Sequence, residues 1–197
     1  MSQKVDFLVQ NDELERKAKL FIEQSGWDLK SCKLVREFNT FAVKSVDEYV
    51  PGSDLRIEGY LSTFNNVDRQ KDVVLPGAFD ATIKGLKSLP MLMDHVNMVN
   101  CQVGSWTDFK IDSRGLYASG SIIASDQTDH LIKLIVGGHI DTLSMGGIFN
   151  YANNGKSDSN GNWQIKDVAL LEGSIVCIPA NPLATFTSKS FLSENPN

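Results

Sequence analysis

The sequence predicts a strand-rich α+β fold in which about seven short strands form a bent sheet or β-barrel with three helices outside it. The chain has 197 residues, of which 42% are hydrophobic, enough for one domain with a sizeable core. Most segments alternate apolar and polar residues and are separated by turn signals, a pattern typical of strands. The strand–helix–strand alternation of parallel α/β folds is absent from this pattern. We therefore expect a helical extension over residues 1–32, a main domain over 33–185 and a flexible tail over 186–197.

A helix is expected near the N-terminus, because Asp12 and Glu15 have the spacing of a capping box and Gly26 is a natural stop. Apolar residues recur between them at helical intervals: Leu14, Ala18, Phe21 and Ile22. The other face of this helix is charged. The pattern fits a helix packed on the main domain and equally a detachable leader.

The remaining elements are predicted from changes in the spacing at which apolar residues recur along the chain. The segments with strand character are 33–43, 55–64, 73–75, 89–94, 103–111, 116–123, 140–149 and 163–178, the last supplying one or two strands. Pro76 suits the first turn of a short helix that runs to about residue 86. A third helix is capped by Ser125 or Asp126 and ends at Gly137.

Composition excludes several classes of protein. Nineteen Lys and Arg against twenty-four Asp and Glu give a net charge of −5, so we expect no nucleic-acid partner. No apolar run is long enough to span a membrane, and the N-terminus has no secretory signal pattern. The cysteines Cys32, Cys101 and Cys177 form no CxxC pair and fit free thiols in a reducing compartment. No nucleotide-binding loop or zinc spacing occurs, so no cofactor or metal is expected.

Three residues could form a serine–histidine–acid set. Ser144 lies in an apolar strand before two glycines, which allow another backbone or a substrate to approach closely. His95 ends a buried strand and could accept a proton from a hydroxyl at neutral pH. Glu172 is a solitary charge in an apolar stretch and invites a partner. Each also has a purely structural explanation: a satisfied core serine, a loop histidine and a solvent-facing glutamate.

The sequence leaves open two other kinds of site, a metal site and a cysteine nucleophile. His139 and Asp141 could share one face of a strand and bind a metal with His95 or His130, although no paired metal motif supports this site. Cys101 lies six residues after His95 and could be a cysteine nucleophile, but free cysteines are more often inert core residues.

The same residues resemble the prohead proteases of tailed bacteriophages, a capsid-maturation family related to herpesvirus assemblin. Five blocks match in order between about residues 55 and 185. They comprise 57–79, 89–106, 115–120, 143–146 and 171–182. The resemblance implies a herpesvirus-protease-like fold, in which residues 33–185 are the protease domain and residues 1–32 are a helical extension or a propeptide.

The resemblance also implies a serine endopeptidase with Ser144 as nucleophile, His95 as general base and Glu172 as the acid that orients the imidazole. Backbone amides near Met145 and Gly146 are then expected to stabilise the oxyanion. The implied substrates are scaffold or major capsid protein segments, with autocleavage and self-association as a dimer. The implied location is the host cytoplasm, inside the immature capsid. A catalytically inactive assembly protein with the same fold is the alternative.

Some residues depart from the family pattern. Lys71 stands where the family usually has glycine, and Gly173 follows Glu172 where a β-branched residue is common. Asp94 and Val96 flank the histidine where relatives often have other residues. Assemblins use a second histidine as third member, but no histidine lies in the matching closing block, so Glu172 remains the candidate.

Overall fold

The computed structural model describes residues 12–37, 50–68, 70–152 and 157–177. Within them lie three α-helices: α1 (Asp12–Gln24), α2 (Asp80–Ile83) and α3 (Asp129–Val136). The strands are β1 (Cys32–Glu37), β2 (Leu55–Thr63), β3 (Asp72–Val74), β4 (Leu89–Met93), β5 (Gln102–Ile111), β6 (Gly115–Ile122), β7 (Leu143–Tyr151) and β8 (Trp163–Ile175). Two short 3₁₀ helices precede β1 and β5, at Leu29–Ser31 and Val99–Cys101.

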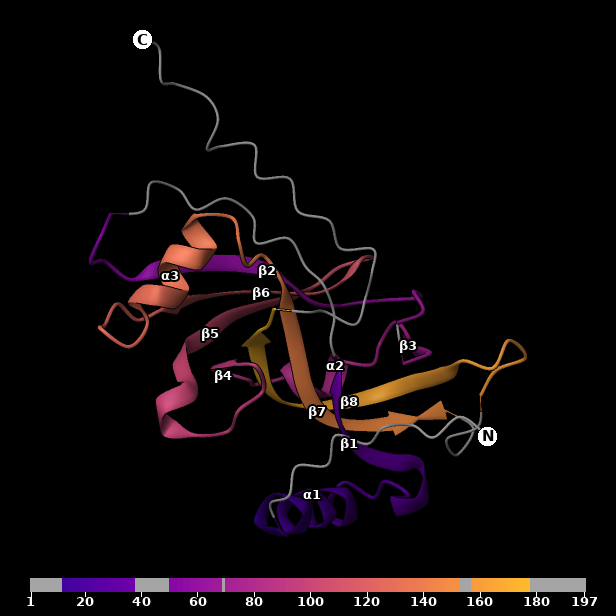
Figure 1. Ribbon diagram of the computed structural model, residues 1–197. Coiled ribbons are helices and arrows are strands. Elements are labelled where there is room, and N and C mark those ends of the chain that lie inside the picture. Colours follow the sequence, from indigo (N-terminus) through magenta and orange to yellow (C-terminus); the bar gives the residue numbers. More distant parts are fainter. Residues whose placement is uncertain (1–11, 38–49, 69, 153–156, 178–197) are drawn as a thin grey trace.

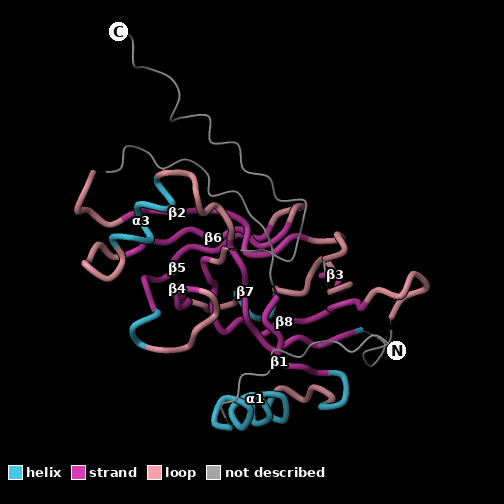
Figure 2. The backbone as a smooth tube through the Cα atoms, in the orientation of Figure 1, coloured by secondary structure: helices cyan, strands magenta, loops and turns pink. Residues whose placement is uncertain are grey.

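All eight strands belong to one sheet with the order β1-β7-β8-β4-β5-β6-β2, and β3 pairs separately with β8. The sheet curls into a half-barrel, with α3 near one end and α1 near the other (Figure 1). Figure 2 shows how strands dominate the described chain and how short loops connect most of them. The strand-rich bent sheet predicted from the sequence is therefore confirmed.

The strand β8 organises the centre of this sheet. It pairs antiparallel with β7 on one side and parallel with β4 on the other, and it also pairs parallel with β3. The sequence left open whether residues 163–178 form one strand or two, and the structure has a single strand over Trp163–Ile175. The parallel pairs could not be foreseen, because alternation within a strand does not specify its neighbours.

Two helices begin later than the sequence predicts. Gly77 has φ +90°, a left-handed conformation that no α-helix contains, so α2 begins only at Asp80. The Thr128 hydroxyl donates to the Ile123 carbonyl and accepts from the Ser125 amide, which folds residues 125–128 into a turn. The helix α3 therefore begins at Asp129 rather than directly after Ser125 or Asp126.

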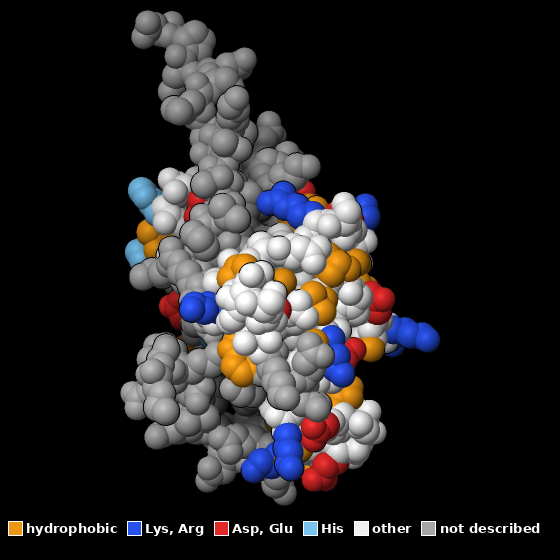
Figure 3. Space-filling view, turned by 90° about the vertical axis from the view of Figure 1, so that its right-hand side faces the viewer, with side chains coloured by type: hydrophobic (Ala, Val, Ile, Leu, Met, Phe, Trp, Pro, Cys, Tyr) orange, Lys and Arg blue, Asp and Glu red, His pale blue; other side chains and the backbone are white. Residues whose placement is uncertain are grey.

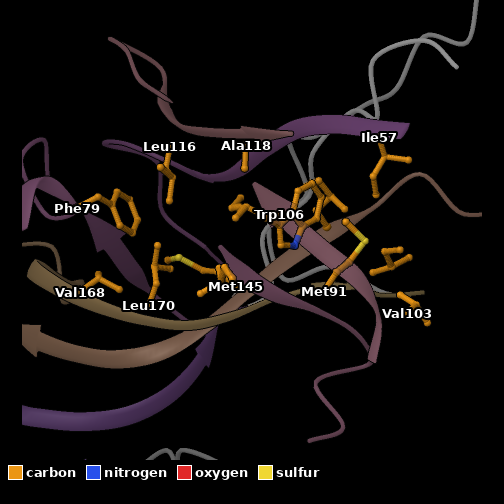
Figure 4. Close-up of a cluster of buried hydrophobic side chains, with 14 of the residues drawn as sticks. Ile57, Phe79, Met91, Val103, Trp106, Leu116, Ala118, Met145, Val168 and Leu170 are labelled. Carbon is orange, nitrogen blue, oxygen red and sulfur yellow. The ribbon is translucent and has the colours of Figure 1, made fainter. Parts of the chain in front are cut away.

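The main core fills the inside of the curled sheet. Trp106 is fully buried, and Met91, Met145 and Leu116 point towards the same cluster from neighbouring strands (Figure 4). At 25 cal/mol per Å² of apolar surface, each such side chain contributes about 1.5–3 kcal/mol by burial. This cluster holds one face of β7 and β8 fixed, so the opposite face is presented away from the core.

The N-terminal helix packs on that opposite face. Ala18 and Ile22 of α1 form a second buried cluster with Ile148 of β7 and Ala169 of β8. Gly26 has φ +68° two residues after the helix ends, as a C-terminal stop requires. Of the two possibilities for this helix, the structure thus shows it packed on the sheet. The predicted tail over residues 186–197 lies outside the described residues.

The described surface mixes charges of both signs. On the face seen in Figure 3, Lys and Arg side chains are interspersed with Asp and Glu and with small hydrophobic patches. None of the helices in the described segments is long and apolar enough to cross a membrane.

Candidate active site

The candidate nucleophile lies on the outer face of β7. Side chains alternate along a strand, so Met145 and Phe149 enter the main core while Ser144, Gly146 and Ile148 share the other face. Figure 4 shows Met145 within the core cluster. Ser144 is therefore directed away from the core.

A β-bulge brings the acid to the same face. Gly146 pairs with Glu172, but the next residue, Gly147, pairs with Leu170, so Leu171 is an extra residue in β8. Without this bulge Glu172 would follow Leu170 into the main core, because residues two apart share a face. Leu171 is instead 37% exposed, and Glu172 lies on the same face of the sheet as Ser144.

The histidine reaches this face from the other neighbour of β8. The preceding residue, Asp94, extends the pairing of β4 with β8, because its backbone N–H donates to the Ile175 carbonyl at 3.0 Å. Asp94 and His95 then adopt left-handed conformations, with φ +48° and +61°. Such conformations cost non-glycine residues about 1–3 kcal/mol each and persist where surrounding contacts impose them. Here they turn the chain so that the imidazole extends across β8 to β7.

The three side chains form a continuous hydrogen-bonded series. Ser144 Oγ lies 2.6 Å from His95 Nε2, and His95 Nδ1 lies 2.5 Å from Glu172 Oε1. Their exposed fractions are 0%, 1% and 8%. An ionised carboxylate only accepts hydrogen bonds, so Nδ1 carries the proton and Nε2 can accept the hydroxyl proton of Ser144. This arrangement can convert the serine into an alkoxide-like nucleophile.

Two neighbours complete the environment of the carboxylate. Gly146 lies opposite Glu172, and a Cβ built there would be 1.9 Å from Glu172 Oε1, so only glycine leaves room for the carboxylate. The Ser174 hydroxyl donates to Glu172 Oε2 at 2.6 Å and accepts from the His95 backbone amide at 3.2 Å. The sequence analysis missed Ser174. Its position two residues after Glu172, and hence on the same strand face, is the signal that could have indicated it.

The other candidates are not brought together. His130 and His139 are exposed, and the described part of the chain contains no group of three or more His, Cys, Asp or Glu side chains arranged to hold a metal. Cys101 Sγ contacts Asn100 Oδ1 at 3.6 Å, while His95 Nε2 faces Ser144. The described residues therefore favour the serine set over the metal and cysteine alternatives.

The proposed oxyanion donors lie within the sheet. Met145 is paired with Glu37 of β1 and with Gly173 of β8, and Gly146 is likewise paired on both sides. The role of the Met145 and Gly146 amides stays a prediction.

Two departures from the family pattern have local explanations. Lys71 has φ +63°, the left-handed conformation for which glycine is the usual residue. Gly173 packs against Trp106, whose Nε1 would lie 2.6 Å from an added Cβ and donates to the Gly173 carbonyl at 3.1 Å. A β-branched side chain at 173 would therefore displace the largest residue of the core.

A serine, a histidine and a carboxylate in hydrogen-bonded sequence are the arrangement of a serine hydrolase. The chain belongs to the caudovirus prohead serine protease family, whose family model matches residues 39–195. The resemblance inferred from the sequence is thus confirmed.

Individual relatives agree with this family. The chain is 31% identical over 130 residues to the prohead protease of Enterobacteria phage HK97, an alignment covering 64% of this chain and 56% of that protein. It therefore spans little more than half the length of this relative. The bacteriophage T4 capsid assembly protease has the same fold, with a TM-score of 0.60 and 17% identity over 74% of this chain and 98% of that one. The KSHV protease aligns with a TM-score of 0.43 and 14% identity over 63% and 60% of the two chains.

Proposed function

We propose that this protein is a serine endopeptidase of bacteriophage capsid maturation, with Ser144 as nucleophile, His95 as general base and Glu172 as the orienting acid. The observation that carries the proposal is the series Ser144 Oγ, His95 Nε2, His95 Nδ1 and Glu172 Oε1, joined at 2.6 and 2.5 Å. Both distances lie within the reach required of a nucleophile and its base, and of a base and its orienting group.

The chemistry follows from this order of groups. Ser144 Oγ attacks the carbonyl carbon of the scissile peptide bond while its proton passes to His95 Nε2. Glu172 stabilises the resulting imidazolium through Nδ1–H. His95 then returns the proton to the leaving amine nitrogen as the C–N bond breaks, which leaves an acyl ester on Ser144. A water molecule, deprotonated by His95, hydrolyses the ester and regenerates the serine.

The proposed substrates are segments of the scaffold or of the major capsid protein, cleaved inside the immature capsid in the host cytoplasm. Support comes from the family to which the chain belongs and from the name of its HK97 relative. Confinement in a capsid raises the effective concentration of substrate segments, so modest affinity suffices. The mild net charge of −5 suits an enzyme whose substrate is protein.

Autocleavage is part of the proposal. The strand β1 precedes the matched family region and pairs along β7 until Glu37 lies opposite Met145, one residue from the nucleophile. Ser144 is also fully buried, so every reagent that reaches Oγ, from a small phosphonylating probe to a second chain, depends on local opening of the outer face of β7. Removal of the N-terminal extension, which we place at residues 1–32 with the protease domain at 33–185, would ease that opening, because α1 packs on the same face of β7 as Ser144.

The test is co-expression of the chain with the capsid protein of the same phage, comparing wild type with Ser144→Ala by intact mass. The proposal predicts shortened capsid protein and shortened protease with wild type, and full-length forms of both with Ser144→Ala. Equal cleavage by both forms would refute Ser144 as nucleophile. If neither form cleaves, the inactive assembly protein is the better description.

A further inference from the structure

The hydroxyl of Ser174 contacts two parts of the candidate site at once. Ser174 lies on β8, directly opposite Ser144 on β7, and its side chain is fully buried. Its hydroxyl donates to Glu172 Oε2 at 2.6 Å and accepts from the backbone N–H of His95 at 3.2 Å. No step of the peptidase reaction given above uses this residue.

The first contact fixes the orientation of the carboxylate. Glu172 binds His95 Nδ1 with one oxygen, and among the described residues Ser174 is the donor to the other. A carboxylate held by one donor can rotate about its terminal torsion, which is broad in glutamate. A second donor on the other oxygen restricts that rotation, and it also satisfies an oxygen that is buried and charged.

The second contact fixes the backbone of the histidine. Since the Ser174 proton is directed to Glu172, an oxygen lone pair remains to accept the N–H of His95. That residue follows Asp94 in a left-handed conformation, at φ +61°, and such a conformation requires contacts that impose it. The same hydroxyl therefore fixes the positions of the His95 imidazole and of the Glu172 carboxylate that pairs with it.

We propose that Ser174 is a positioning residue for the His95–Glu172 pair, and that the site operates as a set of four side chains. Ser174 does not touch the reacting atoms and acts through the pair that it holds. This inference rests on the proposed function, because its effect on rate requires that Ser144 be the nucleophile.

The test compares Ser174→Ala and Ser174→Cys with the matched control Ser119→Ala. Cysteine keeps almost the same volume but donates only weakly. Ser119 is a mostly buried serine on β6 that binds Asp108 at 3.3 Å and lies away from the site. The readouts are the rate of phosphonylation by a fluorophosphonate probe, the melting temperature, and the proton NMR resonance of the His95 Nδ1–H, which a short hydrogen bond moves far downfield.

We expect both Ser174 variants to react with the probe about 10- to 100-fold more slowly, as loss of a hydrogen bond to a charged group predicts. The resonance of their His95 Nδ1–H should move upfield or broaden. Ser119→Ala should leave the labelling rate and this resonance unchanged, with a melting temperature comparable to that of the Ser174 variants. Wild-type labelling rates with an unmoved resonance in Ser174→Ala would overturn the inference. If the wild type itself is not labelled at Ser144, the proposed function fails, and the resonance alone still decides whether Ser174 positions the pair.

Discussion

Replacing Gly146 with alanine would test the position of the carboxylate. A Cβ at 146 would lie 1.9 Å from Glu172 Oε1 and 2.9 Å from Cδ. Ordinary contact begins at 3.4 Å, so the carboxylate oxygen must retreat by about 1.5 Å. A shift of that size is enough to break its 2.5 Å hydrogen bond to His95, since N–H···O bonds are weak or absent beyond about 3.2–3.5 Å.

The expected loss follows from the role of the acid. A misplacement of about 1 Å costs on the order of 10² in rate, and loss of the acid from a serine triad costs about 10⁴. We therefore expect Gly146→Ala to slow phosphonylation of Ser144 by about 10²- to 10⁴-fold. The fold should persist, because the obstructed atoms belong to the end of a side chain. Gly147→Ala is the matched control, since its Cβ would meet the backbone oxygen of Ala169 at 2.5 Å and should lower the melting temperature instead.

A double-mutant cycle separates this mechanism from general damage. In a Glu172→Ala background the atoms that meet the new methyl group are gone, so Gly146→Ala should cost less than about threefold further. Equal losses in both backgrounds would refute the steric argument. Wild-type activity of the single variant Gly146→Ala would refute the placement of Glu172 itself.

Three further predictions concern the rest of the chain. Trp106→Phe leaves the Gly173 carbonyl without its 3.1 Å donor and should destabilise the fold by about 1–3 kcal/mol, seen as a lower melting temperature. Burial, with a hydrogen bond to Glu58 as a smaller cause, raises the pKa of Tyr117 to about 12. As the pH rises, the unfolded chain therefore loses the Tyr117 phenol proton before the folded chain does, and the free energy of unfolding should fall between about pH 10 and 12. Unfolding curves measured at alkaline pH should no longer show this fall in Tyr117→Phe. Ile22→Ala should weaken the packing of α1 on the sheet by about 2–5 kcal/mol, so that limited proteolysis removes this helix before it cleaves the sheet. Unchanged resistance of the helix to the protease would contradict that packing.

The elements of the sheet were largely predictable, because alternation and turn residues are local properties. The strands at 55–64, 103–111 and 116–123 match β2, β5 and β6 to within one residue at each end. The starts of α2 and α3 were not predictable with the same accuracy. They depend on the left-handed conformation of Gly77 and on the side-chain hydrogen bonds of Thr128.

The candidate site was predictable in its residue types but not in its geometry. Ser144 and Glu172 are unusual as polar residues in apolar strands, and that contrast is visible in the sequence. Their shared face depends on the extra residue Leu171, and register in a sheet is set by both strands together. The left-handed turn at His95 carries no glycine to mark it. The spacing of two residues places Ser174 on the same strand face as Glu172, but its contacts with the carboxylate and with the His95 amide depend on the folded structure.

The most direct test of the account is to treat the intact chain with a fluorophosphonate and to locate the modified residue by peptide mass. The account predicts one phosphonyl group on Ser144, with loss of fluoride, and labelling that is slower by about 10³-fold or more in His95→Ala. Labelling of a different residue, or labelling of Ser144 at an equal rate in His95→Ala, would contradict the claim that His95 activates Ser144.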